Sequence, residues 1–232
     1  MPENSLLREI VLDTETTGLD PLQGHRIVEI GCVELFNHIS TGKVFHAYLN
    51  PERDVPAEAT IIHGITDAFL ADKPVFSEQV DEFLTFIGNA PLVIHNAGFD
   101  MNFINAELTR CGYQRLPSAR AIDTVLMARK KFPGAPASLD ALCKRFSVDL
   151  SSRKLHGALL DAQLLAEVYL ELRGGRQPDL AIGAAEITLE SLVESRTREH
   201  RPPRPHAPST EESVAHETFL ASLKDPLWKR VS

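Results

Sequence analysis

Three β-prone runs joined by short links begin the chain, and they restrict its fold more than any other feature. They are REIVLDTE (8–15), RIVEIGCVEL (26–35) and KVFHAYLN (43–50). The first is apolar, the second alternates and is rich in β-branched residues, and Pro51 follows the third, which is the pattern of β-strands. Because the links are short, we expect an antiparallel meander.

Helical and strand-like segments alternate beyond this meander. PLVIHN reads as a short buried strand (91–96), and helices are predicted at 77–87, 99–112, 138–146 and 156–175. Ser77 is the expected N-cap of the first helix, and Gly112 the end of the second. Strands followed by alternating strands and helices predict an α/β fold, with a mixed β-sheet flanked by helices.

The composition of the sequence changes after Gly175. Residues 201–208 (RPPRPHAP) cannot form a regular element. We therefore expect one domain over residues 1–175 and a mostly extended tail over residues 176–232. The apolar content of 43% is enough for a packed core.

Other features bear on location and partners. No apolar run approaches the roughly 18 residues of a membrane helix, and the start, MPENSLLREI, lacks the regions of a signal peptide. Cys32, Cys111 and Cys143 form no CxxC pair, which indicates reduced thiols in a cytoplasmic protein. The net charge of −8 argues against a passive nucleic-acid coat, which would carry a basic face. It does not argue against an enzyme that meets phosphates through metal ions.

Four carboxylates occupy positions that the apolar pattern assigns to the core. Asp13 and Glu15 are two apart in a strand and share a face, while Asp100 and Asp161 fall on the apolar stripes of predicted helices. Each has an ordinary explanation, either a solvated strand end turning at Gly18 or an acid near a helix N-terminus. Convergence on divalent cations would explain all four together, because an unpaired buried carboxylate costs several kcal/mol.

The ligand type indicates the chemistry. Oxygen-only ligands suit Mg²⁺ or Mn²⁺ rather than zinc. Two such cations about 4 Å apart can activate a water and stabilise the leaving oxygen of a phosphodiester. His156 precedes Asp161 by five residues and is expected at the helix entry. Because histidine is the side chain best suited to taking up a proton near neutral pH, it is the candidate general base, the alternative being an ordinary surface histidine.

Three segments resemble the exonuclease motifs of the DEDDh superfamily, which has a ribonuclease H-like fold. They are VLDTETTGLD (11–20), HNAGFD (95–100) and LHGALLDAQ (155–163). The resemblance implies metal-ligand roles for the four acids and a general-base role for the histidine, namely Asp13, Glu15, Asp100, Asp161 and His156.

The sequences between these three motifs indicate a narrower group within the superfamily. IHGITDAFL (62–70), ARKKFPG (128–134) and SLDALCKRF (138–146) are similar to those of bacterial proofreading exonucleases, so the resemblance covers about residues 8–175. It implies that Asp13, Glu15 and Asp161 also contact substrate, and that five further residues lie near the terminal nucleotide: Thr16, Glu58, His63, His95 and Asn96. Asp123 matches no catalytic role, and we expect a structural one.

The tail carries two resemblances to partner-binding segments. Residues 177–182 (QPDLAI) resemble a sliding-clamp docking motif, in which Gln177, Leu180 and Ile182 would fill one polar and two apolar subsites. The segment of about 212–232 resembles the region that anchors such exonucleases to the polymerase catalytic subunit. Its large apolar side chains are costly to leave in water: Phe219, Leu223, Leu227 and Trp228. A small third subunit of the polymerase core is a further implied partner.

Motifs and tail together predict a function. The expected protein removes mispaired 3′-terminal nucleotides from single-stranded or frayed DNA by two-metal-ion hydrolysis, as the proofreading subunit of a replicative polymerase. One alternative is a DEDDh exoribonuclease, because the catalytic core has no need of a 2′-OH. The other is a catalytically silent adaptor between polymerase and clamp, which the five intact catalytic positions argue against.

Overall fold

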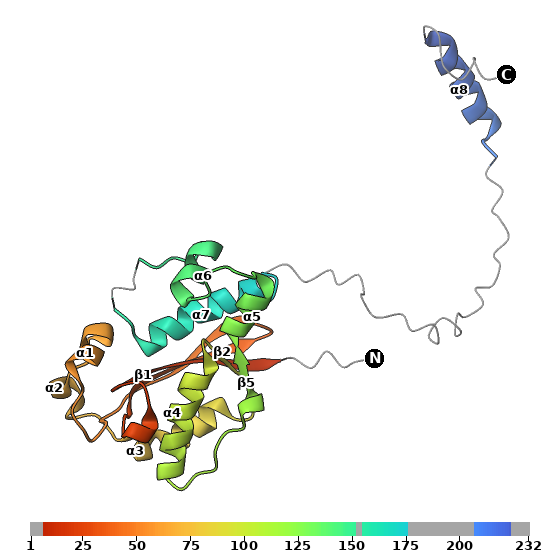
Figure 1. Cartoon of the computed structure of the whole chain (residues 1–232). Helices are drawn as coiled ribbons and strands as arrows, with labels where there is room; N and C mark the ends of the chain where they lie inside the picture. Colours follow the sequence, from red (N-terminus) through yellow and green to blue (C-terminus); the bar gives the residue numbers. More distant parts are fainter. Residues whose placement is uncertain (1–6, 152–154, 176–206, 224–232) are drawn as a thin grey trace. The chain divides into compact units, whose positions relative to one another are not determined.

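A mixed five-stranded sheet organises the larger part of the chain. The computed structural model describes residues 7–151, 155–175 and 207–223, in two compact units, Met1–Leu180 and Ala181–Ser232 (Figure 1). The antiparallel meander is confirmed, and its strands are β1 (Arg8–Thr16), β2 (Ile27–Phe36) and β3 (Ile39–Tyr48). Two short strands extend the sheet in parallel, β4 (Leu92–Ile94) and β5 (Ala121–Asp123), giving the order β3-β2-β1-β4-β5.

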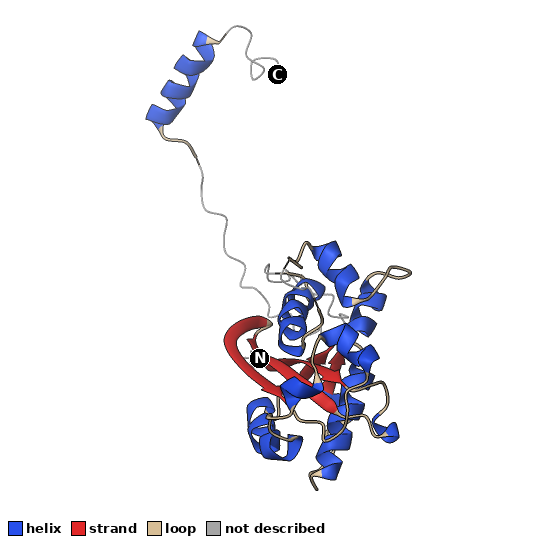
Figure 2. Ribbon diagram, turned by 90° about the vertical axis from the view of Figure 1, so that its left-hand side faces the viewer, coloured by secondary structure: helices blue, strands red, loops and turns tan. Residues whose placement is uncertain are grey.

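Helices cover both faces of this sheet (Figure 2). One core cluster joins Ile10 and Leu12 of β1 to two helices, α3 (Phe76–Ile87) and α4 (Ala97–Arg110). The other joins Val11 to α5 (Thr124–Lys131), α6 (Leu139–Phe146) and α7 (Ala158–Leu172). Because side chains alternate along a strand, Asp13 and Glu15 fall on the α7 face and Thr14 on the α4 face.

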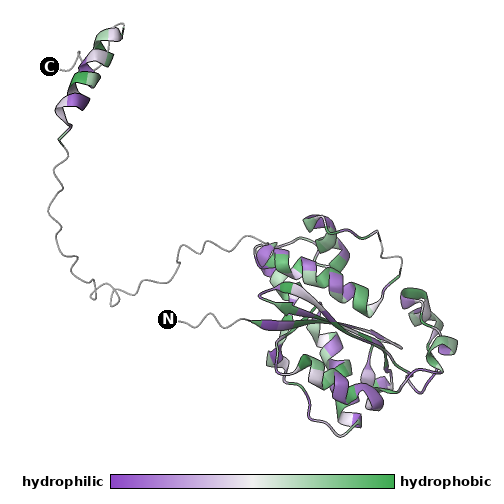
Figure 3. Ribbon diagram, turned by 180° about the vertical axis from the view of Figure 1, so that it is seen from behind, coloured by the Kyte–Doolittle hydropathy of each residue, from purple (hydrophilic) through white to green (hydrophobic). Residues whose placement is uncertain are grey.

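Smaller elements complete the unit. Two short helices pack with Val28 in a third cluster, α1 (Ala57–His63) and α2 (Asp67–Leu70). Single 3₁₀ turns are η1 (Pro21–Gln23) and η2 (Ser118–Arg120). In Figure 3 the helices around the sheet carry both green and purple residues, as helices with one buried and one exposed face do.

Some predicted boundaries need correction. The prediction of Ser77 as N-cap is wrong: α3 begins at Phe76, which is buried, and the Glu78 carboxylate accepts the Val75 amide at 3.1 Å. The strand predicted at 43–50 begins at Ile39. Gly112 follows the end of α4 with a φ of +80°, as expected for a glycine that ends a helix.

The second unit contains α8 (Thr210–Ser222), in a region where the sequence indicated no helix. The Ser209 hydroxyl accepts the Glu212 amide at 3.1 Å, and the Glu212 carboxylate accepts the Ser209 amide at 2.8 Å. This reciprocal pair is a capping box, which satisfies amides that the first helical turn leaves open. Among the described residues, no helix is long and apolar enough to cross a membrane.

Candidate active site

The predicted acids gather where β1 ends and α7 begins. Glu15, His156 and Asp161 offer ligand atoms that all lie within 4.8 Å of one another. Asp13 lines a cavity of about 270 Å³ together with His156 and Asp161. Three acids and the histidine, taken from sequence positions almost 150 residues apart, therefore share one site.

Asp100 reaches this site from the other face of the sheet. The Thr14 amide and hydroxyl both donate to Asp100 Oδ1, at 3.0 and 2.7 Å. Thr14, between the two strand acids, thus fixes the first turn of α4 against the end of β1. Asp100 is buried, as its apolar helix stripe predicted.

Burial and mutual repulsion raise the pKa of two acids in this cluster. Burial, with repulsion from Asp100, Glu15 and Asp161, raises the pKa of Asp13 well above its usual range. Burial likewise raises the pKa of Asp100 to about 7, although its hydrogen bonds to Thr14 oppose the shift. Crowded carboxylates that resist ionisation are a donor set suited to hard divalent cations.

A pH dependence of stability follows from these two shifts. An acid whose folded-state pKa is raised holds more protons folded than unfolded, so stability falls as pH rises from its unfolded pKa to its folded one. In EDTA, these two acids should lower the melting temperature as the pH rises from about 4 to about 7. The lower limit is the ordinary pKa range of Asp, and the upper limit is the raised pKa of Asp100. Saturating Mg²⁺ should remove this fall. Calorimetry across that pH range tests the prediction, and equal profiles with EDTA and Mg²⁺ would contradict it.

Two residues of β2 hold the start of α7 against the sheet. A Cβ atom at Gly31, the residue opposite Asp13, would lie 2.3 Å from backbone atoms of Ala158 and Leu159, so only glycine allows this approach. Buried Glu29 accepts the Ala158 amide at 3.1 Å and contacts His46 Nε2 at 2.7 Å. A carboxylate at a helix N-terminus is favourable. Together they place Asp161, in the first turn of α7, beside β1.

His156 lies at the helix entry, as expected, but the helix predicted from residue 156 begins only at Ala158. Gly157 is the N-cap of the helix, with an extended backbone at φ −158°. The His156 amide donates to the Ile62 carbonyl at 3.2 Å, which ties this entry segment to α1. Its Nδ1 lies 3.2 Å from Asp161 Oδ2, and half of the side chain is exposed. The ring is therefore both near the acids and open to water.

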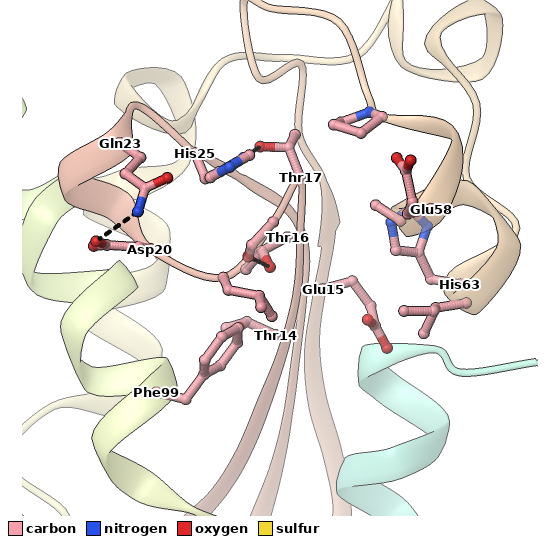
Figure 4. A pocket seen from close by; sticks show the side chains of 15 residues that line it. Thr14, Glu15, Thr16, Thr17, Asp20, Gln23, His25, Glu58, His63 and Phe99 are labelled. Atoms are coloured by element: carbon pink, nitrogen blue, oxygen red, sulfur yellow. Dashed lines mark hydrogen bonds between the residues drawn. The ribbon is translucent and has the colours of Figure 1, made fainter.

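A larger cavity of about 540 Å³ adjoins the acids on the α1 side (Figure 4). Glu15, Thr16, Glu58 and His63 all line it. His63 Nδ1 accepts the Ile65 amide at 3.0 Å, which leaves the proton on Nε2. That buried Nε2 makes no well-formed hydrogen bond among the described residues, although the Thr16 backbone interacts with the ring, and burial lowers the pKa of His63. The cavity therefore presents a neutral donor that a ligand could satisfy.

His95 and Asn96 are not in that cavity. His95 lines the 270 Å³ cavity beside Asp13, with its Nδ1 2.9 Å from the Thr124 hydroxyl. Asn96 lines a neighbouring cavity and precedes α4 with a φ of +63°. The five residues expected near the terminal nucleotide thus divide into two groups on either side of the acids.

Asp123 has the structural role that the sequence indicated. Its carboxylate accepts the Val125 and Leu126 amides at the start of α5, at 2.8 and 3.2 Å. It also accepts the Ala97 amide at the start of α4, at 3.1 Å. One side chain therefore caps two helices.

The tail residues are only partly within the described chain. Phe219 and Leu223 lie at the end of α8 and are 60% and 40% exposed. The other proposed contacts lie outside the described residues: Gln177, Leu180, Ile182, Leu227 and Trp228.

Comparisons with known proteins identify the family of the chain. The family described as Exonuclease matches residues 10–169. The DNA polymerase III subunit epsilon of Rickettsia felis is 51% identical over 224 residues, covering 94% of this chain and 98% of that protein. The chain belongs to the epsilon subunit family of bacterial DNA polymerase III.

Solved structures share the epsilon-type fold. Exonuclease X in complex with 5′ overhanging duplex DNA has a TM-score of 0.54 and 29% identity, over 72% of this chain and 90% of that one. The nuclease domain of 3′hExo, a DEDDh family member bound to rAMP, has a TM-score of 0.61 and 19% identity, over 75% and 96% of the two chains. The predicted ribonuclease H-like fold is confirmed.

Proposed function

We propose that this protein is the 3′→5′ exonuclease that removes mispaired 3′-terminal nucleotides from DNA, as the proofreading subunit of a replicative DNA polymerase. One observation carries the proposal: in a chain of the epsilon family, Asp13, Glu15, Asp100 and Asp161 gather around the end of β1 beside His156. Membership of the family supports DNA as the substrate and the polymerase core as the assembly. A mispaired end is selected because it costs less to separate than a paired one.

The acids would hold two divalent cations, Mg²⁺ or Mn²⁺. Their oxygen donors, burial and mutual repulsion fit such ions. Bound there, the cations supply positive charge for the attacking water and the leaving oxygen. Without them the acids would repel the phosphate.

The chain's own residues perform the remaining tasks. The 540 Å³ cavity binds the terminal nucleoside against Thr16, Glu58 and His63, which places the scissile phosphate at the acids. His156 takes a proton from the attacking water, and Asp161 orients its ring. A bond forms between the water oxygen and phosphorus while the bond to the upstream 3′-oxygen breaks. The leaving 3′-oxygen takes up a proton from water, so a nucleoside 5′-monophosphate and a shortened strand with a free 3′-OH result.

The deciding assay compares two labelled strands. Wild-type protein should release nucleotides from 3′-labelled single-stranded DNA with Mg²⁺ or Mn²⁺ and release none with EDTA. The same assay on an RNA strand separates the alternatives. Faster release from RNA would favour the exoribonuclease, and no release from either strand would leave only the silent adaptor.

His156 provides a second test. His156→Gln should lower kcat about a hundredfold at neutral pH, because the glutamine amide cannot accept a proton from the attacking water. The matched control is His38→Gln, a histidine of the β2–β3 turn whose Nδ1 contacts Glu9 at 2.6 Å. Normal kcat in His156→Gln would remove His156 from the mechanism.

We also infer that the exonuclease domain is residues 1–175 and that residues 176–232 form a partner-binding tail. The exposed Phe219 of α8 and Leu223, which follows the helix, support docking to the polymerase catalytic subunit. Residues 177–182 would bind the sliding clamp, and a small third core subunit would join the same assembly in the cytoplasm. The double variant Gln177→Ala, Leu180→Ala should no longer be captured by the sliding clamp in a pull-down. The variant Phe219→Asp should no longer be captured by the polymerase catalytic subunit. Undiminished capture would reject each contact separately.

A further inference from the structure

A further cavity continues from the 270 Å³ cavity at the acids toward the β4 side of the sheet. The 270 Å³ cavity around Asp13 and Asp161 shares two lining residues, His95 and Ser138, with a cavity of about 550 Å³. The larger one, here called the β4–β5 cavity, is lined by residues at and beyond the ends of β4 and β5, including Asn96, Asp123, Leu126 and Arg129. The two cavities therefore form one continuous path along the carboxyl edge of the sheet.

The position of the path relative to the acids suggests its occupant. If the 540 Å³ cavity holds the terminal nucleoside, as the proposed function requires, that nucleoside lies on the side of Glu15 and Thr16. The rest of the strand must then leave the scissile phosphate on another side. The sheet order places β4 and then β5 next to β1, at about 4.8 Å per strand. The β4–β5 cavity therefore begins about 5–10 Å from β1, within reach of the next nucleotides.

The chemistry of the β4–β5 cavity suits a nucleic-acid strand. Arg129 is exposed, and no carboxylate among the described residues forms an ion pair with it, so its guanidinium can bind a phosphate. Leu126 is 62% exposed and offers an apolar surface to a base. Asp123 would repel a phosphate, but its carboxylate already accepts three backbone amides, from Ala97, Val125 and Leu126.

We propose that the β4–β5 cavity binds the nucleotides immediately upstream of the scissile phosphate, with Arg129 on a phosphate of the retained strand. His95 and Asn96 then contact this retained part rather than the nucleotide that is removed. The proposal rests on the proposed function and adds the direction in which the strand crosses the site.

The structure also offers a competing route. A third cavity, of about 500 Å³, shares the lining residue Asp20 with the 540 Å³ cavity and is also lined by Arg110 and Arg115. Arg110 is engaged, since it pairs with Glu107 at 3.2 Å. Arg115 is exposed, which makes it the matched counterpart of Arg129 on the opposite side.

Comparing substrates of different length separates the loss of a contact with the DNA strand from a structural effect of the substitution. The substrates are the thymidine dinucleotide TpT, which has no phosphate upstream of the scissile one, and a longer oligothymidylate. Arg129→Ala should raise KM for the longer strand about fivefold, the order expected for one exposed charge contact, and leave TpT hydrolysis unchanged. The slope of log(1/KM) against log[salt] should become shallower by about 0.7, as expected for one lost phosphate contact on a single strand.

Two controls complete the experiment. Lys130→Ala, the adjacent exposed cation outside the cavity, and Arg115→Ala should both behave as wild type. An unchanged KM for the longer strand in Arg129→Ala, an equal loss on TpT, or a larger effect of Arg115→Ala would overturn the proposal. Wild-type protein that hydrolyses neither substrate would instead reject the proposed function.

Discussion

Asp13→Asn is expected to reduce exonuclease activity about a thousandfold or more and to make the metal-free protein more resistant to heat. Metal ions contribute several kcal/mol of charge stabilisation in the transition state, and each 1.36 kcal/mol corresponds to about tenfold in rate. Without metal, the same carboxylate is a liability, because Asp100, Glu15 and Asp161 repel it in a buried setting. The amide has nearly the same shape and lacks the charge, so it relieves that repulsion.

Opposite signs for activity and stability distinguish a metal ligand from a structural acid. Nuclease rates with Mg²⁺ and thermal unfolding with EDTA should be measured on the same preparations, with about 2–4 °C expected for each kcal/mol relieved. The control is Asp72→Asn, which makes the same charge change at an exposed carboxylate that pairs with Lys73; it should alter neither quantity much. A lower melting temperature for Asp13→Asn in EDTA would show that its carboxylate stabilises the fold, contrary to this account.

The acids could be found from sequence because each one interrupts an apolar pattern. Asp161 interrupts a helix stripe whose other members are buried, and Asp100 does the same in α4. A charge in a place that would otherwise be core is visible without a structure, since burial alone would be unfavourable. The long strands were predictable for the same reason: their periodicity extends over enough residues to be read.

Other features depend on contacts that no local pattern shows. Glu29 meets the Ala158 amide across 129 residues of sequence, and its only sequence signal was a charge within an apolar strand. The helices α1, α2 and α5 have four to eight residues, too few for a reliable helical period. The division of Thr16 and His63 from His95 and Asn96 arises from the cavities, which exist only in the folded chain.

Gly31→Ala is expected to lower activity more than a hundredfold, although it adds one methyl group and no ligand changes. The added Cβ would lie 2.3–2.4 Å from the Ala158 carbonyl carbon and oxygen and the Leu159 nitrogen. Those are backbone atoms, so the helix itself must move away from β2. The overpacking costs about 1–3 kcal/mol of stability. The displacement also carries Asp161 and His156 away from Asp13 and Glu15, and a shift of about 1 Å in such a site can cost a hundredfold in rate.

A second glycine separates this effect from a general intolerance of added bulk. Gly98 lies in the first turn of α4, two residues before Asp100, yet a Cβ there would meet nothing within 4 Å. Gly98→Ala should keep full activity and gain about 0.5–1 kcal/mol of stability, because alanine loses less backbone freedom in a helix. Gly31→Ala should differ further in metal binding: titration of the folded variant with Mn²⁺ should show weaker affinity than wild type, since its acids no longer converge. Wild-type Mn²⁺ affinity and activity in Gly31→Ala would mean that the contact between β2 and α7 does not position Asp161.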